Sequence, residues 1–419
     1  MRILVLGAGV VGLCSAYRLA REGHQVTVVD AEAGPGLGTS FANGGQLSYS
    51  YVAPLAGPGV LGKVPFWLLD PEGPLHFRPR PDPHQWKWLL RFVRACNATT
   101  AEQTTRRLLL LAYLSRDLMR DVVATEHLDF DHAKSGKLVV QPSAEAMEGA
   151  KRQMELQARW GSEQQALTRE ECLAIEPSLV HIAHRIAGGV YTPSEEAGDA
   201  FLFCQALTAL LQRSNDGVQF VWGAEARQLL RVGGRVVACV TTRGVIEADA
   251  FVLALGNGAR ALAKPLGVDL PVYPLKGYSL TLPIVKDAAA PRISVTDSAR
   301  KVVYARLGDA LRVAGMADVV GPDKSFDERR LDLLVRQARE AFPDAARWDV
   351  LTPWVGLRPA TPTGLPILGP TRQAPNLYLN VGQGALGFTL AMGCAAVITE
   401  LLANRPSPIP LDGMVPGLR

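Results

Sequence analysis

The feature that most constrains this chain is a glycine-rich turn near its start, Gly7-Ala8-Gly9-Val10-Val11-Gly12. A short apolar run at residues 2–6 precedes the turn, and apolar residues at helical spacing follow it over 13–20, which predicts a strand, a turn and a helix. A second strand is expected at 25–29, and it ends in Asp30, 18 residues after Gly12. This order is typical of the βαβ unit that binds dinucleotides.

Each glycine of the turn has a physical role in that unit. Gly7 allows the tight turn, Gly9 lets the backbone approach a pyrophosphate, and Gly12 permits close packing of the helix on the strand. Val10 and Val11 open the helix, where free N–H groups and the helix dipole favour negative charge. The alternative is a glycine-rich strand-to-helix turn that binds no ligand.

Asp30 narrows the choice of nucleotide. At the end of the second strand its carboxylate would accept hydrogen bonds from an adenosine ribose, whereas the 2′-phosphate of NADP would meet its negative charge. FAD or NAD is therefore expected.

The next segment favours FAD over NAD. An NAD dehydrogenase of this type continues with alternating strands and helices, but here a Gly/Pro-rich loop at 34–38 leads into a long run of small residues over 39–48. Such a run lets backbone groups lie against a flat ligand. The residues expected to contact the cofactor are Thr39, Ser40, Asn43, Gly44, Gly45 and Gln46.

These motifs, with three later ones, resemble the D-amino-acid oxidase superfamily of flavoproteins, and within it the small-subunit type of bacterial D-amino acid dehydrogenases. The later motifs are Val272-Tyr273-Pro274-Leu275-Lys276-Gly277-Tyr278-Ser279, Gly356-Leu357-Arg358-Pro359-Ala360-Thr361-Pro362 and Asn380-Val381-Gly382-Gln383-Gly384-Ala385-Leu386-Gly387-Phe388-Thr389. They occur in the family's order and span nearly the whole chain.

The resemblance implies an α/β fold in which a Rossmann-like FAD-binding domain is interleaved with a substrate domain built on an antiparallel or mixed sheet with cap helices. The strand-like runs at 218–222 and 250–256 agree with further nucleotide-domain strands far downstream of the first unit. The expected division assigns residues 1–60, 145–265 and 350–419 to the FAD-binding domain. Residues 61–144 and 266–349 are assigned to the substrate domain, with helices over 85–126 and strands over 271–282 and 302–315.

A second helix N-terminus is expected after the strand-like run at 377–379. The resemblance places this N-terminus at the flavin, where its dipole would stabilise the anion that develops on reduction; the alternative is a loop shaped only for packing. The cofactor contacts expected from this region and from the downstream strands are Gly382, Gly384, Gly387, Thr389, Ala226 and Gly256.

Three residues are expected to bind substrate. The planar guanidinium of an arginine suits bidentate pairing with a carboxylate. The resemblance implies that Arg358 binds the α-carboxylate of the substrate. Tyr51 matches a substrate-lining tyrosine of related enzymes, and Tyr278 is a second candidate. A surface salt bridge for Arg358, and half-buried packing positions for the tyrosines, are the alternatives.

The activity that the resemblance implies is oxidative deamination of D-amino acids by hydride transfer from Cα to the flavin, with electrons passed to a quinone or another respiratory acceptor. The alternatives within enzymes are an oxidase or dehydrogenase of a secondary amino acid, such as glycine, sarcosine or hydroxyproline. A flavin-binding subunit of an electron-transfer complex is the alternative outside them. Residues 356–364 contain no cysteine, so non-covalent FAD is expected.

Composition excludes several other classes. The formal charge of +4 is scattered over the chain, which argues against nucleic-acid binding, and six widely spaced cysteines without a CxxC pair encode no metal site. Glycines interrupt the apolar N-terminus, so a secretory signal is not expected. The aromatic, partly cationic runs at 64–69 and 86–94 suit either a membrane interface or a cap helix, so a cytoplasmic protein with peripheral contact to the inner membrane face is one reading. No pattern in the sequence indicates an oligomeric state.

Overall fold

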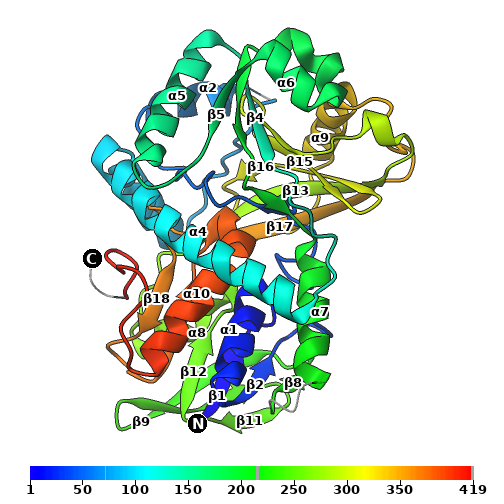
Figure 1. The fold of residues 1–419 in the computed structure, drawn as a ribbon. Helices are drawn as coiled ribbons and strands as arrows, with labels where there is room; N and C mark the ends of the chain where they lie inside the picture. The colour runs from blue at the N-terminus through cyan, green and yellow to red at the C-terminus, as the bar shows by residue number, and fades with distance from the viewer. Residues whose placement is uncertain (71, 214–216, 417–419) are drawn as a thin grey trace.

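The computed structural model describes residues 1–70, 72–213 and 217–416, and two large sheets organise them. Figure 1 shows one sheet with the N-terminus in the lower half of the molecule and the other in the upper half, with helix α4 (Ala98–Glu126) crossing between them.

The lower sheet has six strands in the order β18-β19-β12-β1-β2-β8. All neighbours pair in parallel except β18 with β19, as in an open nucleotide-binding sheet. The bounds are β1 (Arg2–Leu6), β2 (Gln25–Val29), β8 (Gln219–Val221), β12 (Ala250–Leu253), β18 (Ile367–Pro370) and β19 (Leu377–Val381).

Both faces of this sheet are covered. Helices α1 (Val10–Arg21), α7 (Ala200–Arg213), α10 (Gly387–Leu402) and α4 bury one face in the largest apolar cluster. A second cluster on the other face includes the three-stranded sheet of β9 (Ala226–Val232), β10 (Arg235–Thr241) and β11 (Gly244–Glu247), with α8 (Ala259–Ala263) and the short helix η3 (Lys264–Leu266). The short helix η2 (Gly256–Gly258) immediately precedes α8. Burial on both faces explains why the strands read as continuous apolar runs.

The upper sheet has eight strands in the order β17-β13-β16-β15-β14-β4-β6-β5. Their bounds are β4 (Lys137–Gln141), β5 (Gln165–Thr168), β6 (Gly188–Thr192), β13 (Tyr273–Pro283), β14 (Ser294–Asp297), β15 (Val302–Leu307), β16 (Ala310–Asp318) and β17 (Thr352–Ala360). The remaining elements are β3 (Gln46–Leu47), β7 (Glu196–Ala197), α2 (Val60–Leu69), α3 (Pro83–Ala95), α5 (Ala144–Ala158), α6 (Arg169–Ile175), α9 (Glu328–Ala341), η1 (Pro177–Arg185), η4 (Asp287–Ala289) and η5 (Gly384–Leu386).

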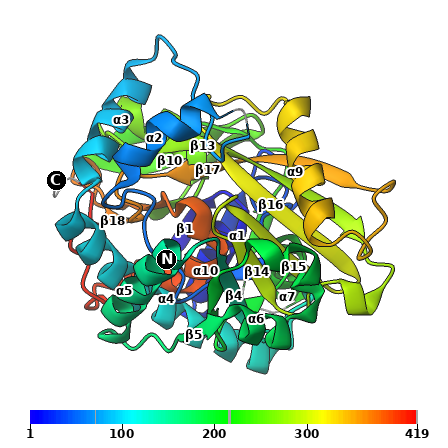
Figure 2. The same cartoon turned by 90° about the horizontal axis from the view of Figure 1, so that it is seen from above.

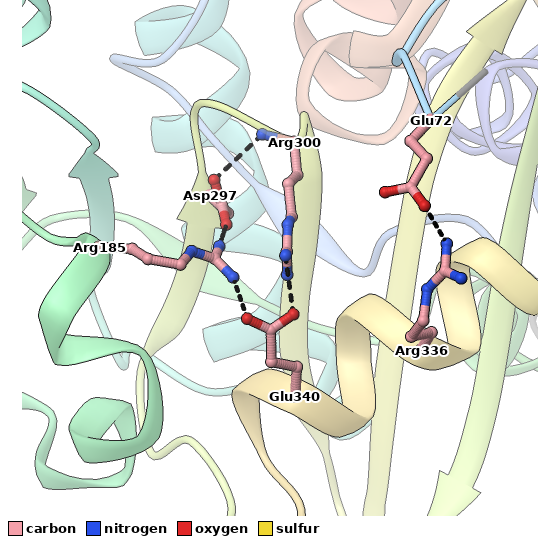
Figure 3. Close-up of polar contacts among 6 residues, drawn as sticks. All are labelled: Glu72, Arg185, Asp297, Arg300, Arg336 and Glu340. Carbon is pink, nitrogen blue, oxygen red and sulfur yellow. Dashed lines mark hydrogen bonds and ion pairs between the residues drawn. The ribbon is translucent and has the colours of Figure 1, made fainter. Parts of the chain in front are cut away.

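The outer face of the upper sheet packs against α9, α6 and η1. Figure 3 shows the ion pairs at its rim: Arg185 of η1 binds Asp297 and Glu340, both at 2.7 Å, and Arg300 also binds Glu340 at 2.7 Å. Glu340 lies on α9, so ion pairs join this helix to the turn between β14 and β15 and to η1, in addition to its packing over the sheet. The inner face is left for the segment that follows β2.

The two sheets divide the chain differently from the expected ranges. Strands β5 and β6 lie within 145–265, and β17 lies within 350–419, yet all three belong to the upper sheet. Helix α4, within 61–144, packs on α10 of the lower half. Strand pairing between distant segments decides this membership, and local pattern carries no information about the partner. The corrected segments are 165–192 and 352–360 in the upper sheet and 98–126 in the lower core.

Within the residues that the structure describes, one helical stretch, Gly384–Leu402, is long and apolar enough to cross a membrane, but 72% of its apolar 18-residue window is buried. It contains α10, which packs between α1 and α4 as a core helix. Five of the six cysteines are buried and all six are free.

Candidate active site

The turn after β1 has the geometry that its glycines require. A Cβ on Gly7, which has φ of 110°, would lie 2.6 Å from the carbonyl oxygen of Ala254, and one on Gly12 would lie 1.8 Å from the carbonyl oxygen of Gly7. Gly9 differs, since the nearest atom to its Cβ would be Ser40 Oγ at 3.4 Å. The backbone is therefore packed closely at Gly7 and Gly12 and accessible at Gly9.

Donors and a carboxylate meet at this turn. Asp30 accepts from the N–H groups of Ala8 at 2.6 Å and Glu32 at 2.9 Å, and no cation pairs with it within the described residues. The N–H of Val10 donates to Ser40 Oγ at 3.2 Å, while those of Gly9 and Val11 have no acceptor in the described part of the chain. A carboxylate without a cation suits neutral ribose hydroxyls, and free N–H groups at a helix start suit phosphate.

The segment 39–51 runs beneath the inner face of the upper sheet and is bonded to it along its length. Thr39 Oγ1 donates to the carbonyl of Leu357 at 3.0 Å, and Gly45, with φ of 64°, donates to Asn43 Oδ1 at 2.9 Å. From the sheet, Ser279 Oγ donates to the Ala42 carbonyl at 2.6 Å and Arg312 Nη1 to the Asn43 carbonyl at 2.7 Å. The segment thus forms a fixed floor between the two sheets.

A Cβ on Gly44 would come within 3.0 Å of Val303 Cγ2, so only glycine lets the segment lie this close to β15. Gln46 uses its side chain within the protein, accepting a hydrogen bond from Lys137 Nζ at 2.8 Å. The segment therefore offers mainly backbone toward a cofactor.

The N-terminus of α10 adjoins both this segment and β17. The N–H of Ser48 donates to Thr389 Oγ1 at 3.0 Å, and Gln383 forms a β-bridge with Ala360. Gly382 has φ of 85°, and a Cβ there would lie 2.6 Å from Thr361 Cγ2.

Two further glycines mark this N-terminus. Gly384 has φ of 58°, and a Cβ on Gly387 would meet nothing within 4 Å. The first turn of α10 is therefore open on one side, as a helix start that faces a ligand has to be.

The downstream cofactor candidates lie at two places. Gly256, with φ of 54°, follows β12, and the neighbouring Asn257 donates its side-chain amide to the Leu357 carbonyl at 2.8 Å. Asn257 Oδ1 is buried without a partner among the described residues, which suits a ligand donor. Ala226 begins β9, two residues after Ala224, whose N–H binds the Asp30 carbonyl at 2.8 Å.

Arg358 is the centre of the second half of the site. It lies on β17 opposite Leu275, and Nη1 donates to the Met316 carbonyl at 2.6 Å. No carboxylate lies within 4 Å of its guanidinium in the described residues, and burial lowers the pKa of Arg358 against an opposing effect from Asp318. A desolvated guanidinium without a counter-ion is a ready site for an anion, and its fork suits a carboxylate.

Two features of the backbone place this guanidinium. A Cβ on Gly277 would lie 2.5 Å from Arg358 Nη2, so the guanidinium lies across the bare backbone of β13. Met316 has φ of 65° where the β13–β16 register shifts between Lys276 and Tyr278, and this irregularity turns its carbonyl toward Arg358. Backbone strain of this kind costs about 1–3 kcal/mol and concentrates at functional sites.

The two candidate tyrosines differ. Tyr51 is 38% exposed and is the last residue of the segment 39–51, with Lys137 Nζ 4.1 Å from the centre of its ring. Tyr278 is buried in the outer core with Leu334 of α9, because alternate residues of a strand face opposite sides of a sheet and it is one residue from Gly277. Tyr278 is therefore corrected from a substrate contact to a core residue on the opposite face from Arg358. No hydrogen bond joins Tyr51 to Arg358 within the described chain.

Sequence reasoning missed four residues that shape this site: Gly277, Met316, Lys137 and Glu195. Gly277 lies inside the motif of residues 272–279, and a glycine within a strand indicates close approach of another group. Lys137 and Glu195 carry no signal beyond being charges beside apolar strands.

These residues fit FAD. Free N–H groups at the start of α1, the accessible backbone at Gly9, the carboxylate of Asp30 and the unpartnered Asn257 Oδ1 follow the carboxyl ends of β1, β2 and β12, which are parallel neighbours in the lower sheet. The bare first turn of α10 completes the set. The whole fits the class of enzymes that use a dinucleotide cofactor, with a separate cationic group at Arg358.

The family comparison agrees. The family model described as FAD dependent oxidoreductase matches residues 2–401, and the chain belongs to this family. The family resemblance and the α/β flavoprotein fold expected from the sequence are thus confirmed, as is FAD as the cofactor.

Curated relatives align over nearly the full length. D-amino acid dehydrogenase 2 of Ralstonia nicotianae is 49% identical over 419 residues, covering 98% of this chain and 98% of the relative. D-amino acid dehydrogenase 2 of Pseudomonas aeruginosa is 45% identical, covering 99% of this chain and 98% of the relative.

Solved structures share the fold. Glycine oxidase from Geobacillus kaustophilus superposes with a TM-score of 0.79 at 20% identity, covering 100% of this chain and 99% of that chain. L-proline dehydrogenase from P. horikoshii gives a TM-score of 0.78 at 17% identity, covering 99% of this chain and 96% of that one.

Proposed function

We propose that the protein is an FAD-dependent dehydrogenase that deaminates D-amino acids oxidatively to 2-oxo acids and ammonia. The observation that carries the proposal is the half-buried guanidinium of Arg358, which has no carboxylate partner in the described residues and lies on the inner face of the upper sheet. The names of the full-length relatives supply the substrate class and its chirality.

FAD, when bound, supplies the acceptor for the hydride that leaves the substrate Cα. Arg358 holds the substrate carboxylate, with its guanidinium fixed by the Met316 carbonyl and given room by Gly277. Tyr51 donates its hydroxyl to the same carboxylate. Positioning supplies most of the catalysis, since hydride removal needs only a neutral amine and reacting atoms held about 3–3.5 Å apart.

The test mixes the purified holoenzyme with D- and L-amino acids and with secondary amino acids under anaerobic conditions and follows bleaching of the flavin band. D-amino acids are expected to bleach it. Arg358→Met should keep its FAD but lose at least about a hundredfold in kcat/KM, because a charge-assisted bidentate pair is removed. Arg347→Met, which removes an exposed arginine, serves as the matched control.

Bleaching by secondary amino acids alone would replace the proposed substrate class with the glycine or proline type. Bound FAD that no amino acid bleaches would make the chain an electron-transfer subunit. An Arg358→Met variant with unchanged KM would refute the carboxylate role of this residue.

The electron acceptor in this proposal is a membrane quinone or respiratory carrier, reached from the cytoplasmic face of the membrane. Supporting it, none of the side chains described for α2 is buried, and Phe66 is 74% exposed. On α3, exposed Trp86 and Leu90 alternate with the exposed cations Lys87 and Arg91. Figure 2 draws both helices at the same edge of the molecule. Apolar side chains flanked by cations suit an anionic lipid surface.

Sedimentation with vesicles tests this contact. Vesicles of phosphatidylglycerol should bind the protein and those of phosphatidylcholine should bind it more weakly, while Phe66→Glu should abolish binding with kcat/KM for a soluble dye unchanged. Val232→Glu on β9, an equally exposed apolar position elsewhere, is the control. Equal loss in both variants, or no binding to either vesicle, would refute the contact.

FAD is proposed to be non-covalent. Cys394, the cysteine nearest in sequence to the Arg358 motif, is buried in α10 beside Gln383. Acid precipitation should release the flavin into the supernatant; flavin that stays with the pellet would contradict this.

A further inference from the structure

A buried lysine lies under the segment that ends in Tyr51. Lys137, the first residue of β4, is 2% exposed and faces inward, since its neighbour Leu138 packs in the outer core. Its Nζ donates to Gln46 Oε1 and to Ser48 Oγ, both at 2.8 Å. A buried ammonium needs compensation, and these two bonds tie it to the cofactor floor.

The third group at this ammonium is the ring of Tyr51, whose centre lies 4.1 Å from Nζ. No carboxylate lies within 4 Å of Lys137 in the described residues. The cation therefore acts on the face of an aromatic ring rather than in a salt bridge. Such contacts contribute about 0.5–2 kcal/mol, with the larger values in desolvated sites.

Glu195 is a second buried charged group that contacts this segment. It is 1% exposed, and Oε1 accepts the N–H of Ser50 at 2.6 Å while Oε2 has no partner among the described residues. Burial lowers the pKa of Lys137 to about 8 and raises that of Glu195 to about 7, with each charge opposing the shift of the other.

The neighbouring charges are otherwise neutralised. Glu196, next in the chain, binds Arg120 of α4 at 2.5 Å and His132 at 2.9 Å. Lys137 therefore faces Glu195 and Tyr51 as its titratable neighbours, and Glu195 faces Lys137, Glu196 and Tyr49.

We propose that Lys137 is a positioning residue for the substrate carboxylate that acts through Tyr51. A cation against the ring draws electron density from it and makes the hydroxyl a stronger donor to an anion, while the bonds to Gln46 and Ser48 fix the segment that carries the ring. This inference rests on the proposed function, in which Tyr51 and Arg358 bind the carboxylate. It adds a residue of the upper sheet that touches neither the carboxylate nor the reacting atoms.

A double-mutant cycle tests the coupling. Benzoate, a carboxylate without an amine, is titrated into the holoenzyme and its binding is read from the change in flavin absorbance. Lys137→Met is expected to weaken benzoate about two- to thirtyfold, the fold-change equivalent of a cation–π contact. In the Tyr51→Phe background, which keeps the ring but lacks the hydroxyl, Lys137→Met should cause no further loss of benzoate affinity.

Two controls complete the design. Lys137→Arg should restore most of the affinity, because it returns the cation, and Lys286→Met should have no effect, since Lys286 is exposed and distant in the fold. Loss of equal size in both Tyr51 backgrounds, or no loss at all, would overturn the inference and leave the carboxylate role of Tyr51 intact. If Tyr51→Phe itself leaves benzoate binding unchanged, both that role and the inference are refuted.

The wild-type pH profile gives a readout that does not depend on folding of the lysine variant. Benzoate stays ionised from about pH 6.5 to about pH 9, whereas Lys137 loses its charge as the pH rises through about 8, so affinity should fall over that range. The fall should be absent in Tyr51→Phe. A fall of the same size in Tyr51→Phe would overturn the inference.

Discussion

Replacement of Gly277 by alanine tests how the substrate cation is placed. The added Cβ would lie 2.5 Å from Arg358 Nη2 and 2.6 Å from Cζ, whereas ordinary van der Waals contact begins at 3.4 Å. The guanidinium must therefore shift by about 1 Å. The shift would break or bend its 2.6 Å bond to the Met316 carbonyl and misalign the fork toward a carboxylate.

The expected cost follows from these distances. Charge-assisted hydrogen bonds contribute about 1.5–3 kcal/mol each, so weakening one of a bidentate pair should lower kcat/KM about ten- to a hundredfold. The fold should be unaffected, since the neighbour that must move is a flexible side-chain end and alanine in a strand costs little backbone entropy relative to glycine. Steady-state kinetics with a D-amino acid and a soluble dye, with FAD content and Tm measured in parallel, are the assay.

Tyr278→Phe is the matched control. It changes the next residue of the same strand, whose side chain faces the outer core, and it should leave kcat/KM unchanged. A Gly277→Ala enzyme with full FAD, normal Tm and wild-type kcat/KM would show that the placement of Arg358 does not matter for turnover, and the reasoning would fail.

Three further predictions concern the cofactor and the fold. Asp30→Asn keeps the shape but removes the charge at the ribose position, so the Kd for FAD should rise about tenfold in a fluorescence titration of apoprotein; an unchanged Kd would exclude contact. Gly12→Ala would place a Cβ 1.8 Å from the Gly7 carbonyl oxygen, so α1 must separate from β1. The variant is expected to have a lower Tm and to lose FAD, and a melting curve like that of the wild type would contradict this prediction. The double variant Lys137→Met with Glu195→Gln should be as stable as wild type or more stable by about 1–4 kcal/mol near pH 7.5 in urea denaturation. The wild type should lose stability as the pH rises from the unfolded Glu value toward 7, because the raised pKa of Glu195 makes ionisation unfavourable in the folded state, whereas the variant should show no such loss.

The nucleotide half of the site was predictable because its determinants are local. Gly7, Gly12 and Asp30 act within one βαβ unit, and the spacing of that unit fixes which residues meet. The same holds for the start of α10, where a strand and a run of glycines adjoin in sequence. The structure has the strand, turn and helix that the pattern predicts, and contact of these residues with FAD stays a prediction.

The substrate half was predictable only in part. Arg358 was identified by motif, but its partners Met316 and Gly277 come from other strands of the sheet. For Tyr278 the error has a simple cause: the sequence of β13 alternates correctly, but it does not say which of the two faces meets the cofactor. Lys137 shows the limit most clearly, since its contacts Gln46, Ser48 and Tyr51 lie far earlier in the chain and meet it only where the segment 39–51 packs against the sheet.

The hydrogen bonds that hold the segment 39–51 also determine the stage of translation at which the site can form. Its partners Lys137, Ser279, Arg312, Leu357 and Thr389 leave the ribosome after it, the last near the end of the chain. The central strand β1 likewise pairs with β12, and β12 pairs with β19, and in both pairs the second strand is synthesised later. A nascent chain therefore carries its cofactor turn from the start but completes the surrounding contacts only when translation is nearly finished, so we expect FAD to bind late and N-terminal fragments to lack affinity for it.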